Sequence, residues 1–143
     1  RVHGALFPAV RPDLRCHRRS RRAPRPAGQD GLGREFPDHP FQVFCILFRS
    51  ALEGWIEPFN SLDTALIEMA ERDPYYSAVF AEFYAILNEK GKALDWLEHA
   101  YRRGYFNYPF IQHYDPFYVN IRGENRFRKL MEDVKRQWEK IEV

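Results

Sequence analysis

The side chains best able to perform chemistry are scattered along this chain. They are five histidines and two cysteines: His3, His17, His39, His99, His113, Cys16 and Cys45. No two histidines have the spacing of a metal site, and the two cysteines are too few and too far apart for a metal box or a disulfide framework. No acid is placed as a partner on the same face as any histidine. We therefore predict no metal site and no catalytic histidine or cysteine.

The sequence also lacks a complete phosphate-binding motif and a pair of carboxylates placed for catalysis. Gly31-Leu32-Gly33 lacks the preceding strand and the third glycine of a dinucleotide fingerprint, and Gly91-Lys92 lacks the upstream glycine of a phosphate loop. Glu132 and Asp133 are adjacent, so on a helix they point to different sides, and Glu132 is placed to pair with Arg136. The sequence predicts no cofactor, and we expect a protein that is not an enzyme.

Length and composition indicate one modest domain. The chain has 143 residues, of which 16% are aromatic. Its longest apolar run, residues 41–48, is interrupted by Gln42 and is too short to span a membrane. The apolar stretch at residues 5–7 is broken by Pro8, so no signal peptide is predicted. We expect a cytoplasmic protein without a membrane partner, and the initial Arg1 is typical of a fragment or a processed piece.

Residues 1–40 are predicted to form a disordered arm rich in Arg, Pro and Gly. Residues 1–34 contain nine arginines and only two acidic residues. The arginines within residues 15–25 could contact phosphate backbones weakly, which makes a nucleic-acid-associated protein the alternative function. No groove-reading helix and no interleaved aromatic residue accompanies them. Arg- and Pro-rich sequence without lysine also arises when a GC-rich gene is translated out of frame, so part of residues 1–60 is hypothesised to be such an artefact.

Residues 73–104 show the spacing of a helix, a short turn and a second helix. Apolar residues at steps of three and four predict the first helix: Tyr76, Val79, Phe80, Phe83, Tyr84 and Leu87. Asp73 is a good N-cap, and Pro74 suits the first helical position. The second helix, residues 92–103, has Ala93, Leu97, Ala100 and Tyr101 on its inner face, and Gly104 is placed to terminate it. The link is short, so the second helix must pack back along the first.

Residues 41–72 are interpreted as a degenerate earlier repeat. The first helix, residues 41–57, is expected to turn one set of side chains inward: Phe41, Phe44, Cys45, Phe48, Leu52 and Trp55. Val43, Ile46 and Leu47 add apolar surface on the other side, so this helix is either buried on most faces or exposed to self-association through residues 41–56. Pro58 is expected to end it, and residues 62–72 are expected to form the next helix.

The remainder of the chain is predicted to close the domain. Asp115 and Pro116 repeat the capping pattern of Asp73 and Pro74, and the short helix that they begin should end at Gly123. A last helix over residues 124–141 places six apolar residues on one stripe: Phe127, Leu130, Met131, Val134, Trp138 and Ile141. Charged residues occupy the rest of this helix. One polar face is what the final helix of a repeat array needs, because no further repeat covers it.

At these residues the chain resembles the tetratricopeptide repeat family. Phe80, Ala81 and Tyr84 match the pattern of the family's first helix, and Ala93, Leu97 and Ala100 match the packing positions of its second helix. Two positions depart from the family: Ser77 stands where a tryptophan-like residue is usual, and Tyr105 stands where a proline often ends the repeat. The resemblance covers residues 61–143 and implies an all-α fold of antiparallel helix pairs, with residues 73–143 as one repeat plus closing helices.

The resemblance also implies a function. The segment after residue 104 is similar to the tail that closes tetratricopeptide arrays in large bacterial regulatory proteins, where the array follows a cyclase-like, kinase-like or winged-helix domain. No part of those domains is recognisable in this sequence. What the resemblance implies is a protein–protein interaction scaffold that closes the array of a larger regulator.

Residues that contact a protein partner are expected on the concave groove and in the aromatic segment. By the resemblance, first-helix residues line the groove, which selects Tyr76, Ser77 and Glu82. The aromatic segment of residues 101–118 adds Tyr105, Tyr108 and Tyr114, because aromatic side chains dominate binding hot spots. The other interpretation is that these aromatics pack the link of residues 105–114 onto neighbouring helices.

Overall fold

A computed structural model describes residues 40–141, and every regular element in that range is helical. The α-helices are α1 (Pro40–Leu52), α2 (Thr64–Arg72), α3 (Pro74–Ile86), α4 (Lys90–Arg102) and α5 (Asn125–Glu139). Three short helical turns join them: η2 (Glu57–Asn60), η3 (Phe110–Tyr114), which is a π-helix, and η4 (Pro116–Asn120), which is a 3₁₀-helix. The all-α prediction is confirmed for this part of the chain. The predicted basic arm and its arginines at positions 15–25 lie outside the described residues.

Aspartates start three of these helices, as the sequence pattern predicts for two of them. Asp73 accepts a hydrogen bond from the Tyr75 amide at 2.8 Å and begins α3. Asp63 does the same for α2, and Asp115 does so for η4, each with an oxygen 2.8 Å from an amide nitrogen two residues ahead. Each carboxylate satisfies an amide that has no partner within the helix.

Three helices end in the same left-handed turn. After α4, the Tyr105 amide donates to the Ala100 carbonyl and the Gly104 amide donates to the Tyr101 carbonyl, both at 3.0 Å. Gly104 has a φ of 104°, which glycine adopts without the steric cost that a Cβ imposes. Asn88, with a φ of 60°, ends α3 in the same pattern, and Gly54 ends α1. The predicted end of the first helix at Pro58 is therefore wrong, because Gly54 stops it earlier.

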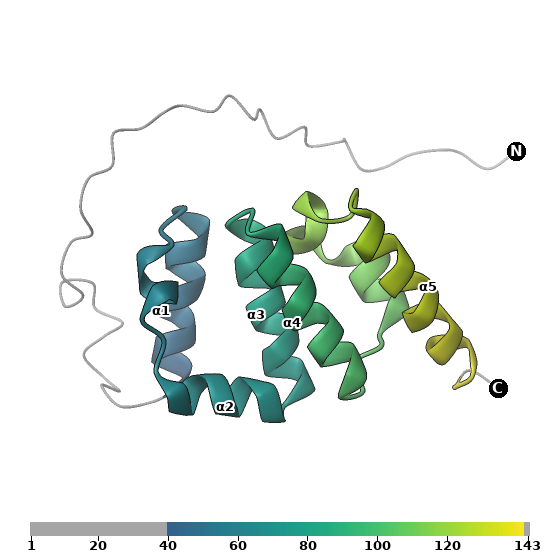
Figure 1. Cartoon of the computed structure of the whole chain (residues 1–143), viewed down its shortest axis with the longest axis horizontal. Coiled ribbons are helices and arrows are strands. Elements are labelled where there is room, and N and C mark those ends of the chain that lie inside the picture. The colour runs from purple at the N-terminus through teal and green to yellow at the C-terminus, as the bar shows by residue number, and fades with distance from the viewer. Residues whose placement is uncertain (1–39, 142–143) are drawn as a thin grey trace, which may run out of the picture. The chain divides into compact units, whose positions relative to one another are not determined.

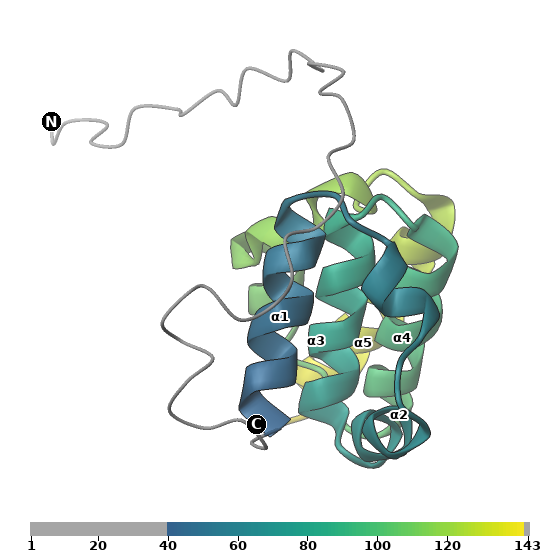
Figure 2. The ribbon, with the colours of Figure 1, turned by 90° about the vertical axis from the view of Figure 1, so that its left-hand side faces the viewer.

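The helices α3 and α4 form the centre of the domain. The turn between them is short, and α4 packs back along α3 (Figures 1 and 2). Fully buried alanines lie on both helices, at positions 78, 81, 85, 93 and 100. Small side chains let the two backbones approach closely, and Phe80 stacks on Trp96 across this interface with ring centroids 5.0 Å apart. The six positions predicted as packing residues are all buried: Phe80, Ala81, Tyr84, Ala93, Leu97 and Ala100.

The buried face of α1 differs from the predicted one. Phe44, Leu47 and Ala51 are buried, whereas Leu52 and Cys45 are exposed. Leu52 is 59% exposed although the spacing placed it inward. The reason is that α1 is apolar on both sides, so its periodicity does not select a face. Contacts with α3 select it, beginning with the Phe44 ring, which lies 4.9 Å from that of Tyr76.

The position of α2 sets α1 apart from the central pair. Figure 1 shows α2 running across the ends of α1 and α3 rather than back along α1. It packs against α3, and the half-buried residues Leu66 and Met69 border the core. The helices α1 and α2 therefore differ in geometry from the α3–α4 pair, and a degenerate repeat over residues 41–72 stays a prediction.

The last helix, α5, is buried on one side. Phe127, Leu130, Met131 and Val134 face the core, as predicted, whereas Ile141 lies beyond the helix and is 60% exposed. The predicted pair of Glu132 with Arg136 is also wrong: Arg136 donates to Asp133 instead, three residues away. On a helix surface, residues three and four positions apart are both neighbours, and Arg136 pairs with Asp133, three positions before it.

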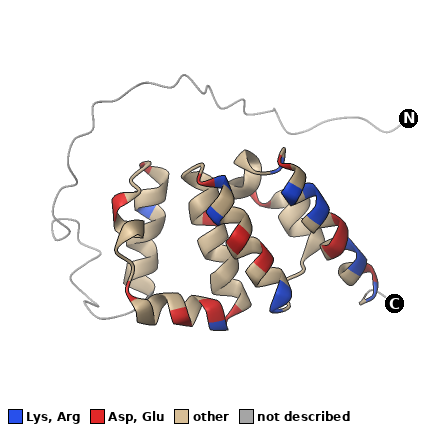
Figure 3. Cartoon of the chain, in the orientation of Figure 1, with Lys and Arg blue, Asp and Glu red and all other residues tan. Residues whose placement is uncertain are grey.

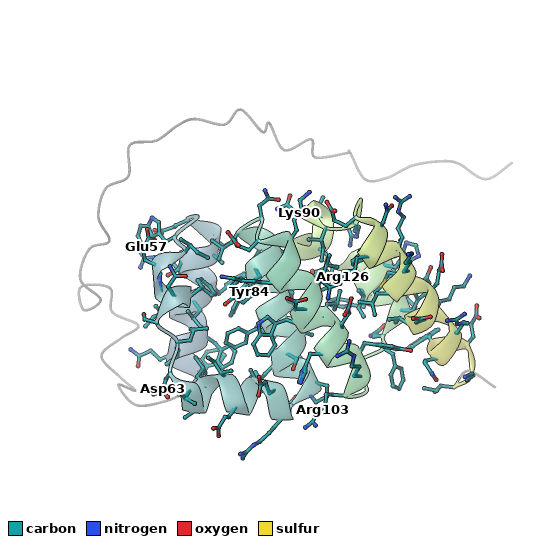
Figure 4. The ribbon with its side chains drawn as sticks, viewed as in Figure 1. Glu57, Asp63, Tyr84, Lys90, Arg103 and Arg126 are labelled. Atoms are coloured by element: carbon teal, nitrogen blue, oxygen red, sulfur yellow. The ribbon has the colours of Figure 1, made fainter. Side chains whose placement is uncertain are left out.

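One arginine joins α5 to α4. The Arg126 guanidinium donates from Nε to Glu98 Oε1 at 2.6 Å and from Nη2 to Asp95 Oδ1 at 2.7 Å. Figure 4 shows Arg126 at the junction of the two helices. A guanidinium bound to two carboxylates fixes direction as well as distance. These ion pairs of Arg126 are accessible to solvent, so they add little to the stability of the domain. We attribute to them mainly the orientation of α5 relative to α4.

Candidate functional site

Two carboxyl groups of interest lie on α3 and in the segment that follows α4. Glu82 lies in the middle of α3, and Asp115 lies between η3 and η4. The charge of Asp115 is among the causes that raise the pKa of Glu82. Asp115 is only 1% exposed, and its Oδ1 accepts the Phe117 amide as the cap of η4. The local rule that places an aspartate before Pro116 thus also brings a carboxylate into the protein interior.

The environment of this pair favours the protonated form of Glu82. Burial and the charge of Asp115 together raise the pKa of Glu82 to about 8. Burial also raises the pKa of Asp115, although the Phe117 amide and the charge of Arg122 oppose that rise.

An arginine and two tyrosines surround the carboxyl pair. Arg122 Nη2 donates to the backbone carbonyl of Asp115. The Tyr118 hydroxyl is completely buried and donates to the Ala78 carbonyl at 3.2 Å. Burial and the two acids raise the pKa of Tyr105 to about 12 and that of Tyr118 well above 10. Both tyrosines are therefore neutral when the carboxyl pair titrates.

A second polar contact joins α3 to α4. The Ser77 hydroxyl lies 2.6 Å from the Ala70 carbonyl and 3.1 Å from Nδ1 of His99. The short contact with a carbonyl oxygen assigns the hydroxyl proton to Ala70, so Nδ1 of His99 must donate to Ser77 Oγ. The imidazole cannot act as a base on a hydroxyl whose proton points elsewhere. Since Ser77 is fully buried, this arrangement is a packing contact between helices.

Replacing Ser77 with alanine should lower the free energy of unfolding by about 1–3 kcal/mol, because it leaves the Ala70 carbonyl and the His99 Nδ1 without their buried partner. Urea denaturation followed by circular dichroism measures this loss. Ser61→Ala, at an exposed position, is the matched control and should change stability by less than about 0.5 kcal/mol. Equal stability of the two variants would show that the buried contacts contribute nothing.

The six predicted contact residues lie in three environments: exposed, half-buried and fully buried. Tyr114 is 74% exposed, and Phe110 beside it is also exposed. Tyr76, Glu82, Tyr105 and Tyr108 are half-buried, and Tyr108 packs its ring against His113 at 5.8 Å. Ser77 is inside the core, where a partner at the surface does not reach it. Packing of the link thus accounts for part of the aromatic segment, and Tyr114 is its most accessible member.

An open crevice lies between α2 and the start of α3. It has a volume of about 570 Å³ and is lined by Ala65, Glu68, Met69, Arg72, Asp73, Pro74 and Tyr76. Tyr76 is the predicted contact residue in this crevice. Tyr75, which the sequence analysis did not select, is 60% exposed on the same turn. The helical period could have identified Tyr75, because it falls opposite the buried positions 77 and 84.

Other kinds of site are not found among the described residues. Within residues 40–141 no group of three or more His, Cys, Asp or Glu side chains could hold a metal ion. No helix in that range is both long enough and apolar enough to cross a membrane. In comparisons with known proteins, no family model, no curated protein and no solved structure matches the chain. The tetratricopeptide resemblance therefore stays a prediction.

Proposed function

We propose that this chain is a protein-binding helical module that closes a tetratricopeptide-like array. The α3–α4 hairpin supports this, because its buried alanines occupy the facing sides of two helices that pack back on each other. Such a repeat buries a continuous core only when neighbouring repeats stack on it. The outer face of each end helix therefore indicates whether another repeat packs there. The observation that carries the proposal is the difference between the two ends of this domain.

The α1 end is apolar on its outer face. Val43 and Ile46 are 40% and 42% exposed, and Leu52 is more exposed still. Isolated exposed apolar residues are ordinary, but Val43 and Ile46 are three residues apart and so share one side of α1, where they form an apolar patch of the kind that marks a protein contact. In the proposed array, a preceding repeat covers this patch. In its absence, association of two copies through residues 41–56 is the competing arrangement.

The α5 end is charged on its outer face. Arg128, Lys129, Glu132 and Arg136 are all exposed, while the opposite side of α5 is buried in the core. Figure 3 shows this contrast: α5 carries many charged residues along its length, and α1 carries few. A charged outer face suits the last helix of an array, because it remains in contact with water. The polarity of the two ends thus gives the proposed array a direction.

A photo-crosslinking experiment tests this proposal. A photoreactive amino acid is placed at Tyr114, at Ile46 or at Lys129 of the full chain, which is then produced in its source organism and irradiated. We expect protein adducts from Ile46 and Tyr114, because these side chains lie on the exposed apolar and aromatic surfaces. Lys129 on the charged face of α5 is the matched control and should give none.

The masses of the adducts separate the possible outcomes. An adduct from Ile46 with the mass of two copies of the chain indicates self-association in place of an array. Adducts of equal yield from all three positions, or none from Ile46 and Tyr114, contradict the proposal. Circular dichroism of each labelled chain confirms that the helices are retained before the crosslinks are compared.

A further inference from the structure

The crevice between α2 and the start of α3 is partly apolar. Met69 and Tyr76 line it, and both are half-buried side chains that border the core. Ala65 and Pro74 complete its apolar part, and the exposed Tyr75 ring lies edge-on to that of Tyr76 with centroids 5.6 Å apart. The volume of about 570 Å³ falls within the range of protein pockets that bind ligands. The crevice can therefore receive an apolar side chain from outside the domain.

The charged part of the crevice is mainly acidic. Glu68 and Asp73 line it together with one base, Arg72. Glu68 lies 3.5 Å from Arg72 Nη2, so the charge of this arginine is already partly balanced. Glu71, three positions after Glu68 and so its neighbour on the helix surface, is exposed, and no ion pair joins it to another described residue. The crevice thus places acidic groups beside an apolar surface.

The charge of α2 as a whole has the same sign. Residues 63–73 contain four acids and one arginine, and Figure 3 shows acidic residues along α2 with a basic one at its end. Arg103 donates to the Arg72 carbonyl at 3.0 Å and brings a second positive charge to that end. Figure 4 shows Asp63 and Arg103 at opposite ends of α2. Acids still outnumber bases by four to two, so this surface attracts cationic groups.

We propose that this crevice binds a basic segment of a partner protein. An apolar or aromatic side chain of the partner enters beside Met69 and Tyr76, and a neighbouring arginine or lysine pairs with Glu68. The buried anchor supplies most of the affinity, whereas the acidic surface selects the partner and speeds its association. The phosphates of a nucleic acid carry the opposite charge, and the same acids repel them.

This inference rests on the proposed function, because it assigns a chemistry to the partner of a protein-binding module. It concerns a different surface from the crosslinking test, since neither Ile46 nor Tyr114 lines the crevice. Adducts from those two positions without a basic peptide at the crevice refute the crevice alone. A basic peptide at the crevice without those adducts refutes the array alone.

Panning of a random peptide library against the full chain tests the crevice. We expect the enriched peptides to combine arginine or lysine with an aromatic or large aliphatic residue. The most enriched peptide is then labelled with fluorescein, and its affinity is measured by anisotropy. That affinity should fall as salt is raised from about 0.05 M to about 0.5 M, because the acids that it pairs with are exposed. No enrichment, or enrichment of acidic or uncharged peptides, overturns the proposal.

Two variants locate the enriched peptide on the domain. Replacing both Glu68→Lys and Glu71→Lys reverses two exposed charges and should weaken binding by about tenfold. Ala65→Trp fills the crevice from an exposed position and should also weaken binding by about tenfold, because it excludes the apolar anchor. Glu132→Lys, at an exposed position on α5, is the matched control for added positive charge and should keep the affinity of the parent chain.

The outcomes separate the possible occupants of the crevice. Circular dichroism first confirms that each variant keeps its helices, and if Ala65→Trp does not fold, the charge reversal at exposed positions decides alone. A folded crevice variant with the affinity of the parent chain shows that the peptide binds elsewhere, which overturns the proposal. Light scattering that finds a dimer of the parent chain and a monomer of Ala65→Trp also overturns it, because a second copy then occupies the crevice.

Discussion

Replacing Phe80 with alanine should lower the free energy of unfolding by about 3–5 kcal/mol, the range expected for removing a fully buried aromatic ring. Phe80 is inaccessible to solvent and joins three helices. Its ring contacts Phe44 of α1 and Phe83 of α3, with centroids 5.9 and 6.0 Å away, and stacks on Trp96 of α4. The cavity left by alanine would open at the point where α1, α3 and α4 meet.

Urea denaturation, followed through helical circular dichroism and tryptophan fluorescence, measures the Phe80 effect. Tyr75→Ala, on the same helix but 60% exposed, is the matched control and should change stability by about 0.5 kcal/mol or less. Phe80→Leu should fall between the two, and it keeps the test informative if the alanine variant does not fold. A Phe80→Ala loss no larger than that of Tyr75→Ala would mean that these helices do not share one core.

The caps at three helix ends were predictable from the sequence because they depend on neighbouring residues alone, whereas the end of α1 was not predicted correctly. Asp73 and Asp115 cap the helices that follow them, and Gly104 ends α4 in the left-handed conformation that glycine permits. Each of these features involves residues within one turn of each other. The same locality explains why the amphipathic stripe of α5 was predicted correctly through Val134, where the helix packs on the core.

The burial of α1 was not predictable in this way. Its apolar residues surround the helix, so each possible inward face looks equally suitable, and the choice depends on the rings that α3 presents. Phe44 and Phe48 fit against Tyr76 and Phe83 of α3, and the exposed side is what remains. Periodicity gives a direction only when one side of a helix is polar.

The carboxyl pair was hidden from sequence analysis for a different reason. Glu82 was predicted as a groove residue and Asp115 as a helix cap, and the structure confirms the cap at Asp115. Their meeting depends on the path of residues 103–114 from the end of α4 back to α3. That path includes the π-helix η3, which no residue pattern in the chain predicts. Long-range pairs of this kind follow from topology rather than from spacing.

The closing segment provides the other large expected effect, at Tyr118. Tyr118→Ala should lower the free energy of unfolding by about 3–5 kcal/mol, because it removes a completely buried ring that packs against Phe127 of α5 with centroids 6.4 Å apart. Tyr118→Phe keeps the ring and loses only the bond to the Ala78 carbonyl, so it should cost about 1 kcal/mol. Val119→Ala is the exposed neighbour and should be nearly neutral.

These three variants, measured by thermal and urea denaturation, separate packing from hydrogen bonding in the attachment of residues 105–122. If Tyr118→Phe costs as much as Tyr118→Ala, the hydroxyl is the main anchor and the buried ring contributes little. If both are neutral, the segment is not held by Tyr118. The expected order, with the ring worth more than the hydroxyl, means that this attachment is made chiefly by apolar burial.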